Sequence, residues 1–224
     1  GFVYFFGGIA KIKYDWLILA QPLRMWLPAN SNLPFIGSVL SSPITAYLFA
    51  WGGMLFDITI PFLLLFDRTR KAAYLLVLIF HGIVGTFFYI GMFPIFMPVL
   101  VLIYFPATWH DRIIDKLAGL FKIGTSIKGD YIAPSLWKKK TLAYGLTLFF
   151  VFQLIMPFRY LFYSQNNMWT EQAYRWGWNI MLIEKNAHVD FKVKNPTTGA
   201  IEHLNAAQYL TKLQYKQMSF QPDM

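Results

Sequence analysis

The sequence predicts an all-α polytopic membrane protein with a small α+β segment after its last helix, and three observations support this. Hydrophobic residues make up 56% of the 224 residues and charged residues only 14%, whereas a soluble domain is roughly 25% charged. The apolar residues gather in runs near the length that crosses a hydrocarbon core of about 30 Å. After residue 163 the chain becomes polar. We therefore divide it into a transmembrane region, residues 1–163, and the start of a periplasmic or luminal domain, residues 164–224.

Several apolar runs are expected to form helices in the membrane. Residues 45–66, 72–90 and 141–163 are long enough for full spans. Residues 93–105 are short for a crossing, and a glycine and a proline break the helix at their start, so we expect a tilted or re-entrant segment there. Residues 1–10 resemble the end of an earlier span, and the chain therefore looks like a piece of a longer polypeptide.

Lysine and arginine are distributed unevenly between the connecting segments. The turn after residues 45–66 holds three and residues 110–140 hold seven, whereas the long segment 11–43 holds only three. By the positive-inside rule the richer loops are cytoplasmic. Residues 11–43 and 164–224 then share the opposite side of the membrane. We expect a multi-pass integral membrane protein with residues 164–224 on the non-cytoplasmic side.

Three connecting segments have patterns of their own. Residues 188–204 alternate apolar and polar residues around a Pro/Gly turn and predict a β-hairpin. Residues 205–218 predict a helix. The cytoplasmic loop 106–140 is expected to contain an interfacial helix, with an apolar face that lies in the headgroup plane. That face carries Ile113, Ile114, Leu117, Leu120 and Phe121. The chain has no cysteine, which excludes disulfides and thiolate metal sites within it, and its scattered basic residues form no nucleic-acid-binding face.

Lys11 ends the apolar run "GFVYFFGGIAK" and is the first candidate for chemistry. One interpretation is structural: a lysine at a helix end lifts its ammonium to the interface and pairs with Asp15, four residues later. The other is a general base, because a partly dehydrated site disfavours the charged form of an amine. A neutral amine then accepts a proton near neutral pH. The residue types alone leave both interpretations open.

Two more ionisable side chains lie inside apolar runs, where such groups are costly and face a bundle interior or a cavity. His81 has no charged residue within nine positions on either side. It is either a hydrogen-bonded core histidine or a group that binds a ligand or handles protons. Asp57 either satisfies backbone groups freed by Pro61 or pairs with a basic residue, for which Arg159 is the natural partner. No metal site is expected from the spacing of the other histidines, His110, His188 and His203.

Four stretches, in this order, resemble the vitamin K-dependent γ-glutamyl carboxylase family, including its bacterial relatives with the horizontally transferred transmembrane (HTTM) domain. They are "YFFGGIAKIKYDWL", "GGMLFDITIPFLLLFDRTR", "FHGIVGTFFYIGMF" and "MPFRYLFYSQNNMWTEQAYRWGWNIML". The first is similar to the family's aromatic–Gly–Lys–Asp–Trp segment, and the second to its Gly–x–x–x–Asp span. The third is similar to its histidine and Ile-Gly-Met-Phe turn. The fourth is similar to the Pro–x–Arg segment and the Trp-Thr-Glu block after the last helix.

The resemblance implies a lyase reaction that carboxylates protein glutamate to γ-carboxyglutamate while vitamin K hydroquinone is oxidised to its epoxide. The family's weak base matches Lys11, and a histidine of its quinol pocket matches His81. We therefore expect these two to be catalytic, with His81 also bonded to a ring oxygen. The quinol, vitamin K hydroquinone or menaquinol, would also contact Tyr4, Phe88 and Met92, and O2 and CO2 are the expected co-substrates. A glutamate-containing peptide or protein would bind Arg159, Trp169, Thr170, Glu171 and Tyr174.

Four positions depart from the family's pattern. Val84 stands where members often carry asparagine, Tyr160 where histidine is common, and Tyr174 and Ile183 where polar groups are common. Each change removes a contact to the quinol or the glutamate, so the quinol step looks better preserved than glutamate recognition. Two other interpretations stay open beside the carboxylase. The chain is a quinol-binding membrane protein of the same fold with other redox chemistry, or a non-catalytic subunit of a larger membrane complex. Lipid is an expected partner in every case.

Overall fold

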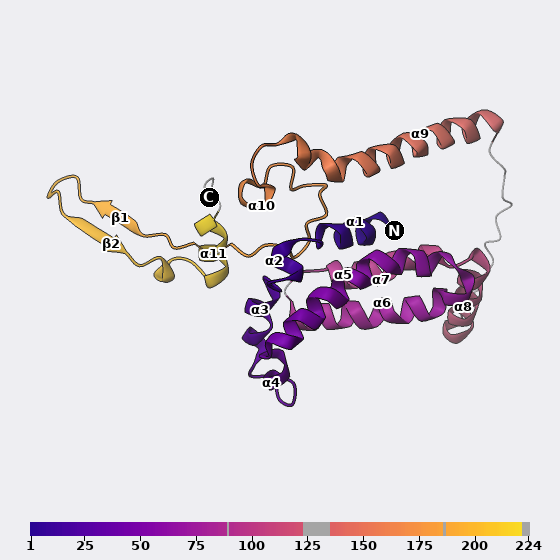
Figure 1. The fold of residues 1–224 in the computed structure, drawn as a ribbon, viewed down its shortest axis with the longest axis horizontal. Helices are drawn as coiled ribbons and strands as arrows, with labels where there is room; N and C mark the ends of the chain where they lie inside the picture. Colours follow the sequence, from indigo (N-terminus) through magenta and orange to yellow (C-terminus); the bar gives the residue numbers. More distant parts are fainter. Residues whose placement is uncertain (89, 123–134, 186, 221–224) are drawn as a thin grey trace. The chain divides into compact units, whose positions relative to one another are not determined.

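The computed structural model describes residues 1–88, 90–122, 135–185 and 187–220. The chain forms two compact units, Gly1–Leu182 and Ile183–Met224, which can be followed by colour along the sequence in Figure 1. The first unit is helical and contains all the residues expected to be catalytic or to bind ligand. In its described part, the second unit consists of a hairpin and short helices. Each unit is considered by itself below.

Among the described residues, three helices are long and apolar enough to cross a membrane. They are α5 (Pro43–Leu65), α6 (Asp67–Phe87) and α9 (Leu136–Ile155), which continues directly into η3 (Met156–Phe162). These helices confirm the predicted runs at residues 45–66, 72–90 and 141–163. A residue with extended backbone, Phe66, separates α5 from α6, and the two helices pack against each other.

The short apolar run after α6 forms α7 (Phe93–Val101), which the single turn η2 (Leu102–Tyr104) extends. The predicted break lies at Gly91, whose φ of 63° favours glycine. A bend of 117° follows before α8 (Ala107–Phe121), so these helices form a broken span or a re-entrant loop. The predicted apolar face of α8 is exposed. The remainder of loop 106–140 includes residues 123–134, which lie outside the described residues.

Helix α1 (Phe2–Ala10) packs along α5, and adjacent glycines permit the close contact. A Cβ added at Gly8 would lie 2.6 Å from Ile58 Cγ1 and 2.9 Å from the backbone nitrogen of Ile58. Only glycine fits at such a distance, because it has no Cβ. At Gly7 the nearest atom to an added Cβ is Asp57 Oδ2, at 3.8 Å. The end of α1 therefore lies beside the middle of α5.

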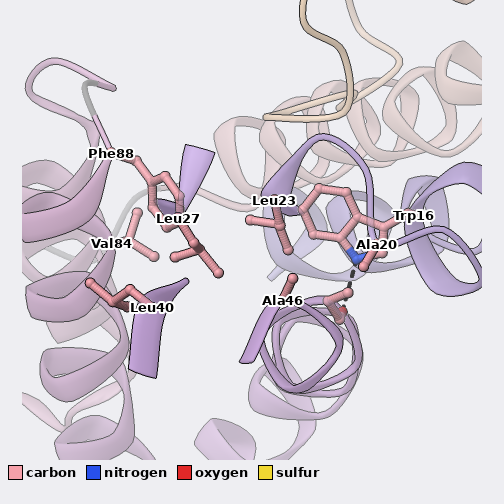
Figure 2. Close-up of a cluster of buried hydrophobic side chains, with 9 residues drawn as sticks. Trp16, Ala20, Leu23, Leu27, Leu40, Ala46, Val84 and Phe88 are labelled. Carbon is pink, nitrogen blue, oxygen red and sulfur yellow. Dashed lines mark hydrogen bonds between the residues drawn. The ribbon is translucent and has the colours of Figure 1, made fainter. Parts of the chain in front are cut away.

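The chain between α1 and α5 folds into short helices: α2 (Tyr14–Leu17), α3 (Leu23–Trp26), η1 (Pro28–Asn30) and α4 (Gly37–Leu40). Their apolar side chains form a buried cluster with residues of α5 and α6, drawn in Figure 2. Within it, Trp16 Nε1 donates a hydrogen bond to the carbonyl oxygen of Ala50 at 2.8 Å, the dashed line in Figure 2. A buried indole with its N–H paired fixes the chain just after Lys11 against α5.

A second buried cluster joins α1 and α5 to α6 and α7. Its residues are Tyr4, Ile60, Leu64, Ala73, Val77, Met97 and Val101. In a membrane, van der Waals packing of this kind, rather than escape from water, holds helices together. The two clusters therefore fix α1, α5 and α6 relative to one another around the residues that bear charge.

Tight turns follow the last long helix. After η3 the chain forms α10 (Asn167–Thr170), whose N-cap Asn166 accepts a hydrogen bond from Met168 N at 2.9 Å. A positive φ, which is uncommon outside glycine, recurs in the next segment at Glu171, Ala173, Trp176, Trp178 and Met181. These turns bring the side chain of Met181 against the cluster around Trp16. Residues 164–182 thus belong to the first compact unit.

The second unit contains the predicted hairpin. Strands β1 (Phe191–Lys194) and β2 (Ile201–Leu204) pair antiparallel, with Phe191 opposite Leu204. Just before β1, a hydrogen bond from His203 Nδ1 to the Asp190 carboxylate, 2.9 Å long, holds the pKa of Asp190 below its usual range. The helix predicted over residues 205–218 is confirmed in part, because it forms two pieces, η4 (Ala206–Gln208) and α11 (Lys212–Phe220).

Replacing Gly8 by alanine is expected to push α1 away from α5, because the added methyl group meets the backbone nitrogen of Ile58 as well as its Cγ1, and the backbone cannot move aside alone. Overpacking of this kind costs about 1–3 kcal/mol. Thermal unfolding in detergent measures the loss. The control is Gly52→Ala on the same helix pair, where an added Cβ meets nothing within 4 Å. Equal stability of the two variants would show that α1 does not depend on this close contact.

Candidate functional site

Two opposite charges meet inside the first unit. Lys11 Nζ lies 2.7 Å from Asp57 Oδ2 and also donates to the carbonyl oxygen of Gly7 at 3.2 Å. Lys11 and Asp57 are each only 7% exposed. The lysine is therefore neither directed to bulk water nor paired with Asp15. Of the two alternatives for Asp57, the structure shows pairing with a basic residue, and that residue is Lys11 rather than Arg159. Both residues are held where α1 ends against the middle of α5.

His81 lies in the same unit and is more deeply buried, at 2% exposure. A hydrogen bond of 2.7 Å joins its Nε2 to the hydroxyl oxygen of Tyr4. The other ring nitrogen, Nδ1, is buried without a hydrogen-bond partner among the described residues. An unpaired buried polar atom is costly, so this nitrogen has unused capacity to bind a ligand. The rings of Phe80 and Phe93 pack against the imidazole.

A cavity lies between these two polar groups. Lys11, Asp57, Tyr4 and His81 all line it. The rest of its wall is mainly apolar and comes from α1, α2, α3, α5, α6, the start of α7 and the turns near residue 180. Those wall residues include Leu23, Phe49, Gly53, Phe80, Val84, Phe88, Ile90, Phe93, Ile180 and Met181. The arrangement is that of a ligand site: apolar walls with a few polar groups at defined positions.

Trp16 links the ion pair to the packed core. Its ring also lines the cavity, and its centroid lies 5.5 Å from Lys11 Nζ. A cation near an aromatic ring is stabilised by the ring's electron density. Because the indole N–H is bonded to α5, the ring cannot rotate away without breaking that bond. The ammonium of Lys11 is thus enclosed by Asp57, a carbonyl oxygen and an aromatic ring.

The structure brings some of the predicted site residues together and leaves others apart. Lys11, His81, Tyr4 and Phe88 line the cavity, whereas Met92 does not line it and is 63% exposed. Val84, one of the departures from the family pattern, lies in the wall and gives it an apolar surface.

None of the residues expected to bind glutamate lines the cavity; these are Arg159, Trp169, Thr170, Glu171 and Tyr174. Trp169 is 79% exposed. The Tyr174 hydroxyl donates to the carbonyl oxygen of Asn179 at 2.7 Å. Burial, with the nearby charge of Glu171, raises the pKa of Tyr174 to about 12, so this side chain is a neutral phenol that holds the turn in shape.

Asp57 is the site residue that our sequence-based set omits as a functional group. The signal was present, because a carboxylate inside an apolar span needs a partner. Its partner lies 46 residues away, and only the packing of α1 on α5 identifies it. Gly53 and the pair Ile180 and Met181 had no comparable signal. Among the described residues, no cluster of three metal-binding side chains occurs.

Two family models match the chain. The HTTM domain matches residues 1–109, and the vitamin K-dependent gamma-carboxylase lumenal domain matches residues 138–224. Together they cover most of the sequence, in the order in which the resembling stretches occur. The chain belongs to the vitamin K-dependent gamma-glutamyl carboxylase family. No solved structure matches it significantly.

Residues from both matched regions line the cavity. The four polar side chains that define it, Tyr4, Lys11, Asp57 and His81, lie in the HTTM region. The lumenal-domain region contributes Ile180 and Met181, which are apolar. The groups able to exchange protons therefore come from the helical region alone.

Replacing Tyr4 by phenylalanine tests the hydrogen bond that orients His81 in this carboxylase-family chain. The variant leaves both imidazole nitrogens unpartnered, and a lost buried partner costs about 1–3 kcal/mol. We expect a lower unfolding temperature in detergent. Tyr14→Phe is the matched control, because Tyr14 is 67% exposed. If both variants unfold at the wild-type temperature, the Tyr4–His81 bond does not stabilise the site.

Proposed function

We propose that this protein binds a hydroquinone of the vitamin K or menaquinone type in the cavity and uses its oxidation to carboxylate protein glutamate. The observation that carries the proposal is the placement of a buried ion pair and an unpartnered histidine nitrogen on one apolar cavity. That placement occurs in a chain matched by both carboxylase family models.

The described side chains fit such a ligand. Phe80, Phe88 and Phe93 offer flat apolar walls to a fused ring. If the Tyr4 hydroxyl donates to Nε2 of His81, the neutral imidazole carries its hydrogen on Nδ1. That N–H then donates to a ring oxygen. The Lys11–Asp57 pair lies on the same cavity and can serve a second oxygen, because a hydroquinone has two.

The chemistry needs a dry site at the edge of the membrane. Oxidation of the bound quinol by O2 supplies the strong base that removes the γ-hydrogen of glutamate before CO2 adds. The residues of the cavity exclude the water that would quench this base, since Lys11, Asp57 and His81 are each less than 10% exposed. A lipid-soluble quinol reaches the cavity from the bilayer around α5 and α6. We place the protein in a bacterial inner membrane, with the second unit on the periplasmic side.

A second candidate function is quinol binding with other redox chemistry. It is favoured by the charges at the cavity: among the described residues that line it, Lys11 is the sole cation, and Asp57 already neutralises it. A glutamate carboxylate therefore finds no unpaired basic partner there. The carboxylase proposal requires glutamate to bind outside this cavity wall.

Replacing Lys11 by alanine is expected to abolish carboxylation, because the cavity loses its cation and leaves Asp57 without a partner. The full-length protein is incubated with reduced vitamin K, O2, labelled bicarbonate and a glutamate peptide, and incorporated label is counted. Lys13→Ala is the control, since Lys13 lies two residues away and does not line the cavity. No incorporation by the wild-type protein, with quinol oxidised nonetheless, would favour the second candidate. Full activity of Lys11→Ala would remove Lys11 from the mechanism.

Replacing Gly53 by leucine is expected to block quinol binding without unfolding the protein. Gly53 lines the cavity, and an added Cβ meets nothing within 4 Å, so the new side chain extends into the empty space. We expect at least about a tenfold loss of affinity, or about 1.4 kcal/mol, in equilibrium binding of a labelled naphthoquinone. Gly52→Leu is the control, on the exposed face of the same helix. Equal binding by the two variants would place the quinol elsewhere.

A further inference from the structure

The second unit has a cavity of its own at the base of the hairpin. Residues next to β1 and β2 line it together with residues of α11. Its ionisable side chains are His188, Asp190, His203, Lys212 and Tyr215, and most of the other lining residues are apolar. Apolar walls with a few polar groups are typical of a ligand site.

Helix α11 forms one wall of this cavity and is tied to the segment before β1. The Tyr215 hydroxyl accepts a hydrogen bond from Val189 N at 2.9 Å and lies 3.1 Å from His188 Nδ1. Lys216 also forms an ion pair with Glu184. The wall is therefore in place before a ligand arrives, which lowers the entropy that binding costs.

One face of the hairpin carries basic side chains that continue from this cavity. The register places Lys192 opposite His203 and Lys194 opposite Ile201. Opposite residues of an antiparallel pair share a face, and so do alternate residues of one strand. Lys192, Lys194 and His203 therefore lie on one face, with Asp190 at its end beside the cavity. Both lysines are exposed.

The charges on this surface do not balance. Among the described residues that line the cavity, Asp190 is the sole carboxylate, and it already accepts a hydrogen bond from His203 Nδ1 at 2.9 Å. Lys192 also lies close enough to Asp190 for its charge to lower the pKa of that carboxyl group. Within the described part of the chain, no hydrogen bond or ion pair is recorded for Lys194 or Lys212. Positive charge is thus in excess.

We infer that this hairpin face and the cavity at its base bind an acidic peptide, and the inference rests on the proposed function for the identity of that peptide, a glutamate-rich substrate. One side-chain carboxylate enters the cavity beside Lys212. Other carboxylates of the same peptide meet Lys192 and Lys194. The cavity beside Lys11 offers a carboxylate no unpaired cation among its described lining residues, so the peptide needs a basic partner on another surface.

The geometry of a strand suits this peptide. Alternate residues of an extended chain lie about 7 Å apart on the same side, so glutamates at every second position match the spacing of Lys192 and Lys194. The sheet has two strands among the described residues, and β1 therefore presents an outer edge to which an extended peptide can add. Backbone pairing then supplies affinity, and the lysines select for negative charge.

Peptide binding is measured by fluorescence anisotropy on the full-length protein in nanodiscs of zwitterionic lipid, without quinol. The probe is a labelled peptide with glutamate at alternate positions and an amidated C-terminus, so that its side chains supply every carboxylate. We expect it to bind more tightly than the same peptide with glutamine at those positions, with an affinity that falls as salt is added. Equal affinities for the two peptides would overturn the inference.

Reversing the charge of the hairpin lysines tests the face directly. Lys192→Glu with Lys194→Glu is expected to weaken binding at least about tenfold, because attraction becomes repulsion at both positions. The matched control is Lys138→Glu with Lys139→Glu, two exposed lysines of α9 in the first unit with the same change in net charge. Wild-type affinity in the hairpin variant, or an equal loss in the control, would overturn the inference.

Asp190→Asn gives a signature of the opposite sign. It removes the one negative charge at the end of the basic face, so we expect the glutamate peptide to bind about two- to fivefold more tightly. The pair of Asp190 with His203 is exposed to solvent, and pairs of this kind contribute little to stability. Weaker binding by this variant would show that the pair has only a structural role at this surface, and it would overturn the inference.

Carboxylation separates this inference from the proposed function. In the hairpin variant we expect a higher KM for the glutamate peptide at unchanged kcat, because docking changes and the quinol cavity does not. An unchanged KM would overturn the inference alone. A wild-type protein that binds the peptide but does not carboxylate it would overturn the proposed function and leave the peptide site in place. Release of the peptide by phosphatidylglycerol vesicles, and not by phosphatidylcholine vesicles, would assign the face to anionic lipid and overturn the inference.

Discussion

The ion pair between Lys11 and Asp57 is the interaction on which the rest of the site depends. It joins the end of α1 to the middle of α5, and both charges are almost completely removed from solvent. Such pairs contribute little net stability, because the cost of removing two charges from water offsets their attraction. Removing one partner is a different matter, since it leaves a lone charge buried and costs about 3–5 kcal/mol. A chain that keeps an arrangement of this kind beside a cavity is better explained by chemistry than by stability.

The backbone around the pair is built to allow it. Gly8 lets α1 approach α5 closely enough for the lysine to reach the aspartate. Beyond Lys11, the bond from Trp16 to Ala50 returns the chain to α5, so the lysine is anchored from both sides. His81 reaches the same cavity from α6 and is oriented by Tyr4 of α1. Three helices therefore contribute polar atoms to one space, and the contact of α1 with its neighbours decides whether that space exists.

The sequence predicts the long elements well because their signals are local. Runs of apolar residues mark α5, α6 and α9, and alternation around a turn marks the hairpin in the second unit. Lys11 and His81 stand out for a related reason, since ionisable groups inside apolar runs are rare. The sequence does not show which residues pair when they lie far apart in the chain. Lys11 and Arg159 both stand near the end of an apolar run, and only the packing of the helices shows that Asp57 pairs with Lys11. The turns with positive φ that bring Ile180 and Met181 to the cavity could not be predicted either, because this conformation is uncommon for residues other than glycine.

The HTTM region and the lumenal-domain region contribute different kinds of residue to the cavity. All four polar side chains that face it come from α1, α5, α6 and the residue that ends α1, whereas Ile180 and Met181 supply only apolar contact. On the proposed function, the quinol and its proton are therefore handled by the helical region. The segment after the last long helix adds Ile180 and Met181 to the cavity wall, and on the same proposal the peptide binds outside that wall. Val84 fits this division, because an apolar side chain in the wall removes a polar contact without disturbing the ion pair. An apolar side chain at this position therefore lowers the polarity of the wall around a bound ring and leaves the Lys11–Asp57 pair unchanged.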